Sequence, residues 1–123
     1  MFTDTFHEVV GKEGVVSIVS WAEGEAHVVN TWNSYLGLPD GGRLLIPAWK
    51  MRRTERNTLQ NNRVLLTLGS REVQGRMGPG TGFLVEGTAR FVKAGEEFEA
   101  MKAKFPFLTR VLEVTVTSLT QTI

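Results

Sequence analysis

The residues with the clearest chemical potential lie in the stretch HVVNTWNSYL, residues 27–36. It begins like a β-strand and then carries six positions rich in hydrogen-bonding and aromatic groups: Asn30, Thr31, Trp32, Asn33, Ser34 and Tyr35. Small polar side chains can bind a phosphate, a polyol or the edge of a heterocycle, and Trp32, Tyr35 and Trp49 can form apolar walls. A planar cofactor needs both kinds of group. The alternative is a strand that ends in a turn, with its aromatic side chains in the core.

A second candidate is the basic segment KMRRTERN, residues 50–57. Lys50, Arg52, Arg53 and Thr54 stand at the start of a predicted helix, where unpaired N–H groups and partial positive charge attract anions. A guanidinium fork and a hydroxyl strengthen such a seat for a phosphate group. The alternative is that Thr54 caps the helix and the basic side chains are solvated.

Other candidates for chemistry are weaker. His7 and His27 are the only histidines, and neither has a second ligand at metal-binding spacing. His27 could activate Ser20 or Ser34, but no motif supports a nucleophile there. The glycine-rich segment GRMGPGTG, residues 75–82, is followed by a predicted strand and has no phosphate-binding lysine, so a flexible connection is expected. The sequence therefore predicts no catalytic residue and no metal site.

Length and composition set the broad class. The chain has 123 residues, which predicts one domain over 1–123. It has no cysteine, a net charge of +1 and no long basic run, which argues against disulfides, thiol chemistry and nucleic-acid binding. No apolar window is long enough for a membrane span, and the N-terminus is unlike a signal peptide. We expect a cytoplasmic protein that has no membrane partner.

Periodicity and turn residues predict the elements that position these groups. Helices are expected over 3–14, 54–62 and 95–105, and strands over 14–20, 26–32, 43–49, 63–70, 83–92 and 110–119. Pro47 places its strand at a sheet edge or at a strand end. Glu96, Glu97 and Glu99 are expected on a solvated helix face. The fold class is mostly β with short helices, and six closely spaced strands favour a small antiparallel barrel.

Several of these segments also resemble a known family. The motifs EGVV, NTWNSYL, TLGSR, GRMGPGTGFL, EFEA and a terminal QT with an aliphatic residue are similar to the FMN-binding split-barrel family, which is related to pyridoxamine-phosphate oxidases and flavin reductases. The similarity runs nearly end to end. It implies a six-stranded antiparallel split β-barrel, a homodimer, and one noncovalent FMN per subunit near the dimer interface.

The resemblance also implies site residues. The cofactor-binding set is Asn30, Thr31, Trp32, Asn33, Ser34, Tyr35, Pro47, Ala48, Trp49, Lys50, Met51, Arg53, Thr54, Glu13, Phe107 and Ile123. Arg53 and Thr54 are implied as the main phosphate contacts, and Glu13 as a charge near the flavin. Ile123 of the partner subunit is implied to cover part of the isoalloxazine.

The chain departs from the family pattern at several of these positions. Trp49 and Lys50 replace small glycines, which adds an aromatic wall and changes access to the ring. Arg53 replaces a lysine, and an arginine can bind phosphate through two hydrogen bonds. Phe107 takes the place of a tryptophan.

The resemblance implies a carrier that transfers electrons to and from an unidentified redox partner protein. An FMN-dependent oxidoreductase, similar to flavin reductases or pyridoxamine-phosphate oxidases, is the first alternative. A non-catalytic FMN store or dimeric scaffold is the second. The absence of an evident catalytic acid or base in the sequence favours the carrier over the enzyme.

Overall fold

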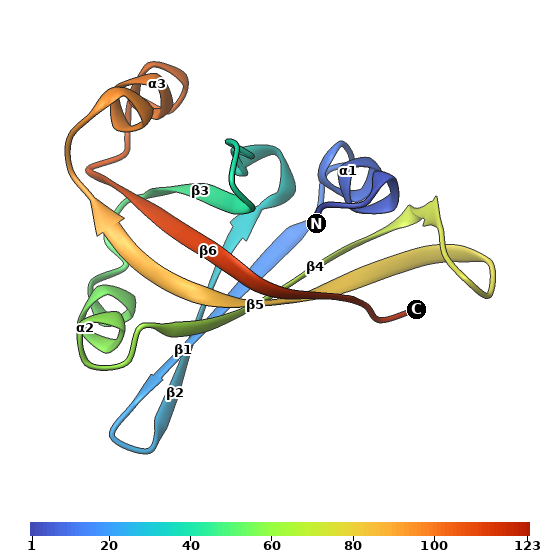
Figure 1. Ribbon diagram of the computed structural model, residues 1–123, viewed down its shortest axis with the longest axis horizontal. Helices are drawn as coiled ribbons and strands as arrows, with labels where there is room; N and C mark the ends of the chain where they lie inside the picture. The colour runs from blue at the N-terminus through green and yellow to red at the C-terminus, as the bar shows by residue number, and fades with distance from the viewer.

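The computed structural model describes all residues of the chain, 1–123. The elements follow one another along it (Figure 1) in the order α1 (Asp4–Val10), β1 (Val15–Ala22), β2 (Glu25–Trp32), the short 3-10 helix η1 (Asn33–Tyr35), β3 (Arg43–Ala48), α2 (Arg52–Gln60), β4 (Arg63–Gln74), β5 (Pro79–Val92), α3 (Glu96–Lys104) and β6 (Arg110–Gln121). No helix of the structure combines the length and apolar character needed to cross a membrane.

The six strands form one antiparallel sheet in the order β2-β1-β4-β5-β6-β3. The sheet curls on itself, and α1, α2 and α3 lie around its rim (Figure 1). Its edge strands, β2 and β3, do not pair with each other, so the barrel stays split. This confirms the predicted six-stranded antiparallel split barrel.

Local sequence signals explain several element boundaries. The Thr3 hydroxyl accepts a hydrogen bond from Phe6 N at 3.1 Å and caps the start of α1. Glu23 and Gly24 both have positive φ, which gives the β1–β2 hairpin a tight turn of the hand that matches strand twist. Pro47 lies in edge strand β3, where its missing N–H is tolerated.

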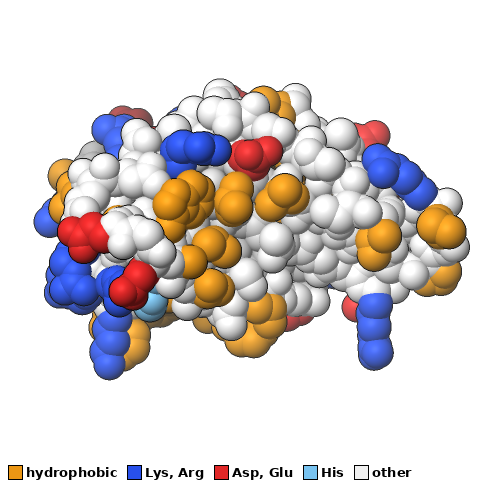
Figure 2. Space-filling model, turned by 90° about the horizontal axis from the view of Figure 1, so that it is seen from below, with side chains coloured by type: hydrophobic (Ala, Val, Ile, Leu, Met, Phe, Trp, Pro, Cys, Tyr) orange, Lys and Arg blue, Asp and Glu red, His pale blue; other side chains and the backbone are white.

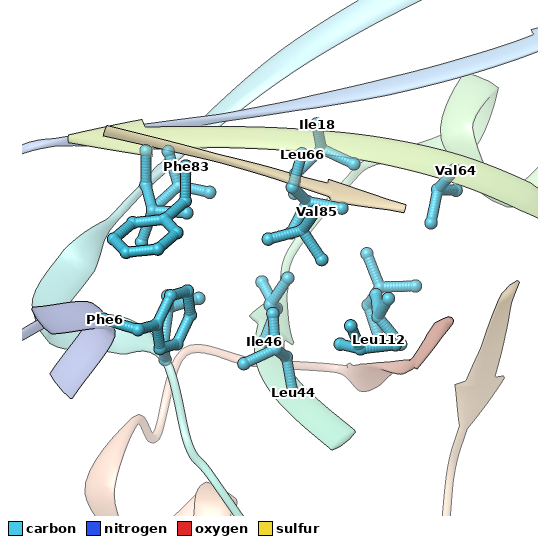
Figure 3. Packing of buried hydrophobic residues seen from close by; sticks show 14 of the residues in the cluster. Phe6, Ile18, Leu44, Ile46, Val64, Leu66, Phe83, Val85 and Leu112 are labelled. Carbon is cyan, nitrogen blue, oxygen red and sulfur yellow. The ribbon is translucent and has the colours of Figure 1, made fainter. Parts of the chain in front are cut away.

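The hydrophobic core fills the inside of the curled sheet. Figure 3 shows Ile18, Leu66 and Val85 from β1, β4 and β5 pointing toward Ile46 and Leu112 from β3 and β6. These five side chains have no exposed surface. The two halves of the sheet are therefore held together by packing of this core, although their outer edges do not pair.

Two predictions about elements need correction. The segment 75–82 is not a loop as a whole, because β4 continues to Gln74 and β5 begins at Pro79. A Cβ on Gly82 would lie 3.1 Å from Leu68 O, so glycine serves close strand approach here. Helix α2 begins at Arg52, two residues before the predicted start.

Helix α3 packs on the outside of β3 and β6. Its inner face is apolar, and Met101 on it is buried with Leu45, Leu108 and Val111. Glu96, Glu97 and Glu99 lie on the exposed face of the same helix, as predicted.

Glu97 accepts two hydrogen bonds from Arg43, at 2.7 and 2.9 Å. Arg43 also donates to Glu113 at 2.8 Å, and Arg90 donates to the same carboxylate at 2.6 Å. The hydrogen bond from Arg90, together with that from Arg43, lowers the pKa of Glu113 below its ordinary value despite its burial. This ionic group joins α3 to β3, β5 and β6.

Candidate functional site

A small open pocket lies where the ends of β2 and β3 meet, at the split between the two edges of the sheet. It has a volume of about 140 Å³ and is lined by Asn30, Thr31, Trp32, Tyr35, Pro47, Trp49, Met51 and Phe107. All eight lining residues belong to the predicted cofactor set. The structure thus brings together three segments that are distant in the sequence.

Aromatic side chains form the walls of this pocket. The ring of Tyr35 lies 5.9 Å from that of Phe107 and 5.0 Å from that of Phe105, between centroids. Trp32 and Trp49 are 46% and 56% exposed, which is high for such large apolar groups. Exposed aromatic faces beside a hollow are suited to cover a flat ligand.

The polar residues at the end of β2 divide into two groups. Asn30 faces outward, and its Oδ1 accepts a hydrogen bond from Ser17 Oγ at 3.1 Å. Asn33 is fully buried, and its Nδ2 donates to Lys12 O at 2.8 Å and to Val9 O at 3.2 Å. The Asn33 amide therefore fixes η1 against α1, and it does not line the pocket.

Ser34 and Glu13 form a local pair beside this region. Glu13 accepts hydrogen bonds from Ser34 Oγ at 2.7 Å and from Ser34 N at 3.2 Å. The hydrogen bond from the Ser34 side chain lowers the pKa of the exposed Glu13 carboxyl below its ordinary value. A fixed negative charge thus stands at the start of η1.

The backbone turns sharply between β3 and α2. Lys50 and Met51 have φ values of 63° and 49°, and both lie in the left-handed region; we call this pair the Lys50–Met51 corner. Left-handed conformations cost non-glycine residues about 1 kcal/mol or more each. Such strain concentrates at functional sites, and here it separates the aromatic pocket from the start of α2.

The start of α2 has the features of an anion site. No side chain caps the helix, so the N–H groups of its first turn have no intrahelical or capping partner. Thr54, the third residue of α2, is 1% exposed, and its Oγ1 has no hydrogen-bond partner. The Arg53 side chain is 41% exposed, and its Nη2 lies 3.4 Å from Glu25 Oε2 in a loose ion pair. A buried hydroxyl without a partner is costly unless something binds it.

Ile123 lies away from the pocket of its own chain. Its carbonyl accepts hydrogen bonds from Arg76 N at 3.2 Å and Thr81 Oγ1 at 3.1 Å, at the β4–β5 hairpin. Its side chain is 58% exposed and lines a groove shared with Glu13. The structure therefore separates Glu13 and Ile123 from the eight residues of the pocket within one chain.

One residue at this site was missed by sequence reasoning. Arg110 begins β6 and is only 3% exposed. Its Nη2 donates to the carbonyl of Lys50, and its Nε lies 3.2 Å from Glu55 Oε1. An arginine next to a predicted strand end suggests an exposed side chain, so the sequence carried no signal of this contact.

Known proteins are similar to this chain in sequence and in fold. The model of the family described as Pyridoxamine 5′-phosphate oxidase matches residues 2–122. The chain is 50% identical to an FMN-binding protein of Nitratidesulfovibrio vulgaris over 123 residues, which is all of both chains.

Solved structures with a similar fold are much more distant in sequence. A crystal structure of Group A Streptococcus HupZ has a TM-score of 0.82 at 16% identity, over 99% of this chain and 94% of that one. An FMN-binding protein from Syntrophomonas wolfei has a TM-score of 0.71 at 11% identity, over 88% of this chain and 76% of that one. At these identities the likeness concerns the fold alone.

Proposed function

Because the chain belongs to the pyridoxamine 5′-phosphate oxidase family, we propose that it is an FMN-binding protein that acts in electron transfer. One FMN binds noncovalently per chain, near the interface of a homodimer. The observation that carries the proposal is the buried, unpartnered hydroxyl of Thr54 at an uncapped helix start, next to a pocket walled by aromatic side chains.

The phosphate end of FMN fits the start of α2. The first-turn N–H groups and Thr54 Oγ1 would donate hydrogen bonds to the phosphate, and the macrodipole of the helix would favour its negative charge. The Arg53 guanidinium would exchange its exposed ion pair with Glu25 for the phosphate, because a loose surface pair contributes little to stability. These contacts satisfy the hydroxyl that is otherwise unpaired.

The ring end fits the pocket between β2 and β3. Trp32, Tyr35, Trp49 and Phe107 offer flat apolar surface, and the amide of Asn30 offers hydrogen bonds to a heterocycle edge. Pro47, Ala48, Lys50 and Met51 connect the two ends as one continuous stretch of chain. The Glu13 carboxylate, which accepts a hydrogen bond from the Ser34 hydroxyl, does not line this pocket and would influence the flavin only through its charge.

When bound, FMN would supply the redox chemistry, because its ring accepts and donates electrons reversibly. The protein tunes it by covering the ring, by hydrogen bonds and by nearby charge. None of the eight pocket-lining residues is Asp, Glu or His, so the pocket offers no carboxylate or imidazole for acid–base catalysis. This composition supports a carrier over an enzyme.

The exposed apolar side chains support a homodimer. Val28 and Trp32 on β2 and Val15 on β1 are 56%, 46% and 46% exposed, although they are hydrophobic. Val15 and Trp32 are directly opposite each other in the β1–β2 pairing. Figure 2 shows hydrophobic side chains gathered near the middle of one face of the molecule, bordered by basic and acidic side chains. A partner subunit would bury such surface and could bring its Ile123 onto the flavin.

A cytoplasmic location and an unidentified redox partner protein complete the proposal. The cysteine-free sequence is compatible with a reducing compartment. Electron exchange with a protein partner needs one edge of the ring near the surface, and the openness of the aromatic pocket is compatible with that.

The experiment that tests the proposal is a visible absorption spectrum of the purified protein after addition of FMN and removal of the excess. Retention of about one FMN per chain, with reversible reduction and the mass of a dimer, supports it. Failure to retain FMN rejects the cofactor assignment. Sustained consumption of NAD(P)H with added acceptors would instead favour the FMN-dependent oxidoreductase.

A further inference from the structure

Arg110 is a buried charge that core packing does not explain. It is 3% exposed, and its guanidinium lies 5.2 Å from the ring of Phe91. Its single ion pair, with Glu55 at 3.2 Å, is not aligned as a hydrogen bond, and Nη1 has no partner at all. Burial of a charge with so few partners is costly, and an apolar residue would often serve stability better.

The side chain of Arg110 makes its one hydrogen bond with the backbone of the site. Nη2 donates to the Lys50 carbonyl, which belongs to the peptide bond between the two left-handed residues of the Lys50–Met51 corner. The adjacent Thr109 N donates to Ala48 O at 2.9 Å, so β6 holds the chain on the near side of the same corner. Glu55 lies in the first turn of α2, on the far side. Arg110 thus spans the corner from β3 to α2.

We propose that Arg110 is a positioning residue of the flavin site, which holds the Lys50–Met51 corner in its left-handed conformation. Through that corner it sets the angle between the aromatic pocket and the phosphate seat of α2. This inference rests on the proposed function for the identity of the ligand, FMN. The contacts of Arg110 with the corner do not depend on it. A clamp is needed because Lys50 is not a glycine, yet it occupies a backbone conformation that only glycine adopts without strain.

The experiment separates this role from a general structural one by rescue. Arg110→Met is combined with Lys50→Gly, which tolerates the left-handed backbone, and in a matched control with Lys50→Ala, which removes the same side chain but keeps the strain. Arg110→Met is expected to weaken FMN binding roughly tenfold, and riboflavin binding less, because the phosphate end moves most. Lys50→Gly restores most of the FMN affinity, and Lys50→Ala does not.

Two results overturn the proposal. One is FMN affinity in Arg110→Met that equals the wild type, and the other is equal behaviour of the glycine and alanine double variants. Arg63→Met, at an exposed arginine that contacts Trp21 and not the corner, controls for loss of a cation. If Arg110→Met does not fold, Arg110→Lys replaces it, since lysine keeps a charge for Glu55 but lacks the fork that spans both contacts.

A readout without FMN keeps this inference distinct from the proposed function. In the apo protein, Arg110→Met should speed amide hydrogen exchange over residues 49–54, and Lys50→Gly but not Lys50→Ala should slow it again. Absence of this pattern rejects the role of Arg110. If the variants show this pattern but the wild-type protein binds no FMN, only the proposed function is rejected.

Discussion

Thr54→Val should change stability and FMN affinity in opposite directions. The Thr54 hydroxyl is buried without a partner, and valine has nearly the same shape with a methyl in its place. Removal of an unsatisfied buried polar group is expected to raise the free energy of unfolding of the apo protein by about 1 kcal/mol. For a chain of 123 residues, that gain raises Tm by roughly 4 °C.

The same change should weaken FMN binding. A hydroxyl that donates to a phosphate makes a charge-assisted hydrogen bond, which contributes about 1.5–3 kcal/mol. Its loss raises the Kd for FMN by roughly ten- to a hundredfold. Riboflavin lacks the phosphate, so its affinity should stay near that of the wild type. Apo-protein melting and fluorescence titration with both flavins measure the two effects.

Thr58→Val is the matched control one turn further along α2. Thr58 is also buried, but its hydroxyl donates to Glu55 O at 3.0 Å, so valine there should lower apo stability and leave FMN affinity unchanged. A Thr54→Val protein that melts below the wild type, or that binds FMN as tightly, would refute the reasoning that the unpaired hydroxyl is kept for the phosphate.

Three further predictions concern the other parts of the site. Arg53→Ala should weaken FMN binding about tenfold and riboflavin binding hardly at all, by fluorescence titration, and equal losses would show that Arg53 does not bind the phosphate. Ile123→Ala keeps the main-chain contacts of that residue. Weaker FMN binding or a smaller fraction of dimer would support its place on the partner's flavin, and no change in either would reject it. Glu13→Gln should be less stable than the wild type at neutral pH, because the hydrogen bonds from Ser34 lower the pKa of Glu13 in the folded state. That difference is fully present above the ordinary glutamate pKa and should vanish as pH falls through the lowered value, in denaturant titrations from neutral pH to about pH 3; a constant difference would contradict it.

Much of the fold could be predicted because its signals are local. The Thr3 cap, the turn at Gly24 and the position of Pro47 each depend on a few adjacent residues. The segment 75–82 misled because its glycines are typical of a flexible loop. In the folded chain they let β4, β5 and the C-terminal residues approach closely, which depends on parts of the chain that are distant in sequence.

The site was predictable to the extent that its residues are contiguous. The pocket between β2 and β3 gathers eight residues that had been singled out by type or by resemblance. The role of Asn33 as an anchor of η1, and the burial of Arg110 under the corner, follow from tertiary contacts that no local pattern encodes. The early start of α2 has the same origin, because it depends on the left-handed backbone of Met51.

The order of the strands has a consequence for synthesis of the protein. Strand β2 pairs with β1, its neighbour in sequence, across a short turn. The strand partner of β3 is β6, so Arg43 cannot pair until Thr115 has been synthesised. On the ribosome, one wall of the pocket therefore exists long before the other. If FMN binds at this pocket, we expect its loading to require nearly the whole chain. Leu44 and Ile46 are fully buried in the folded protein, but until β6 is made they remain exposed on the nascent chain. There they could bind chaperones or promote aggregation.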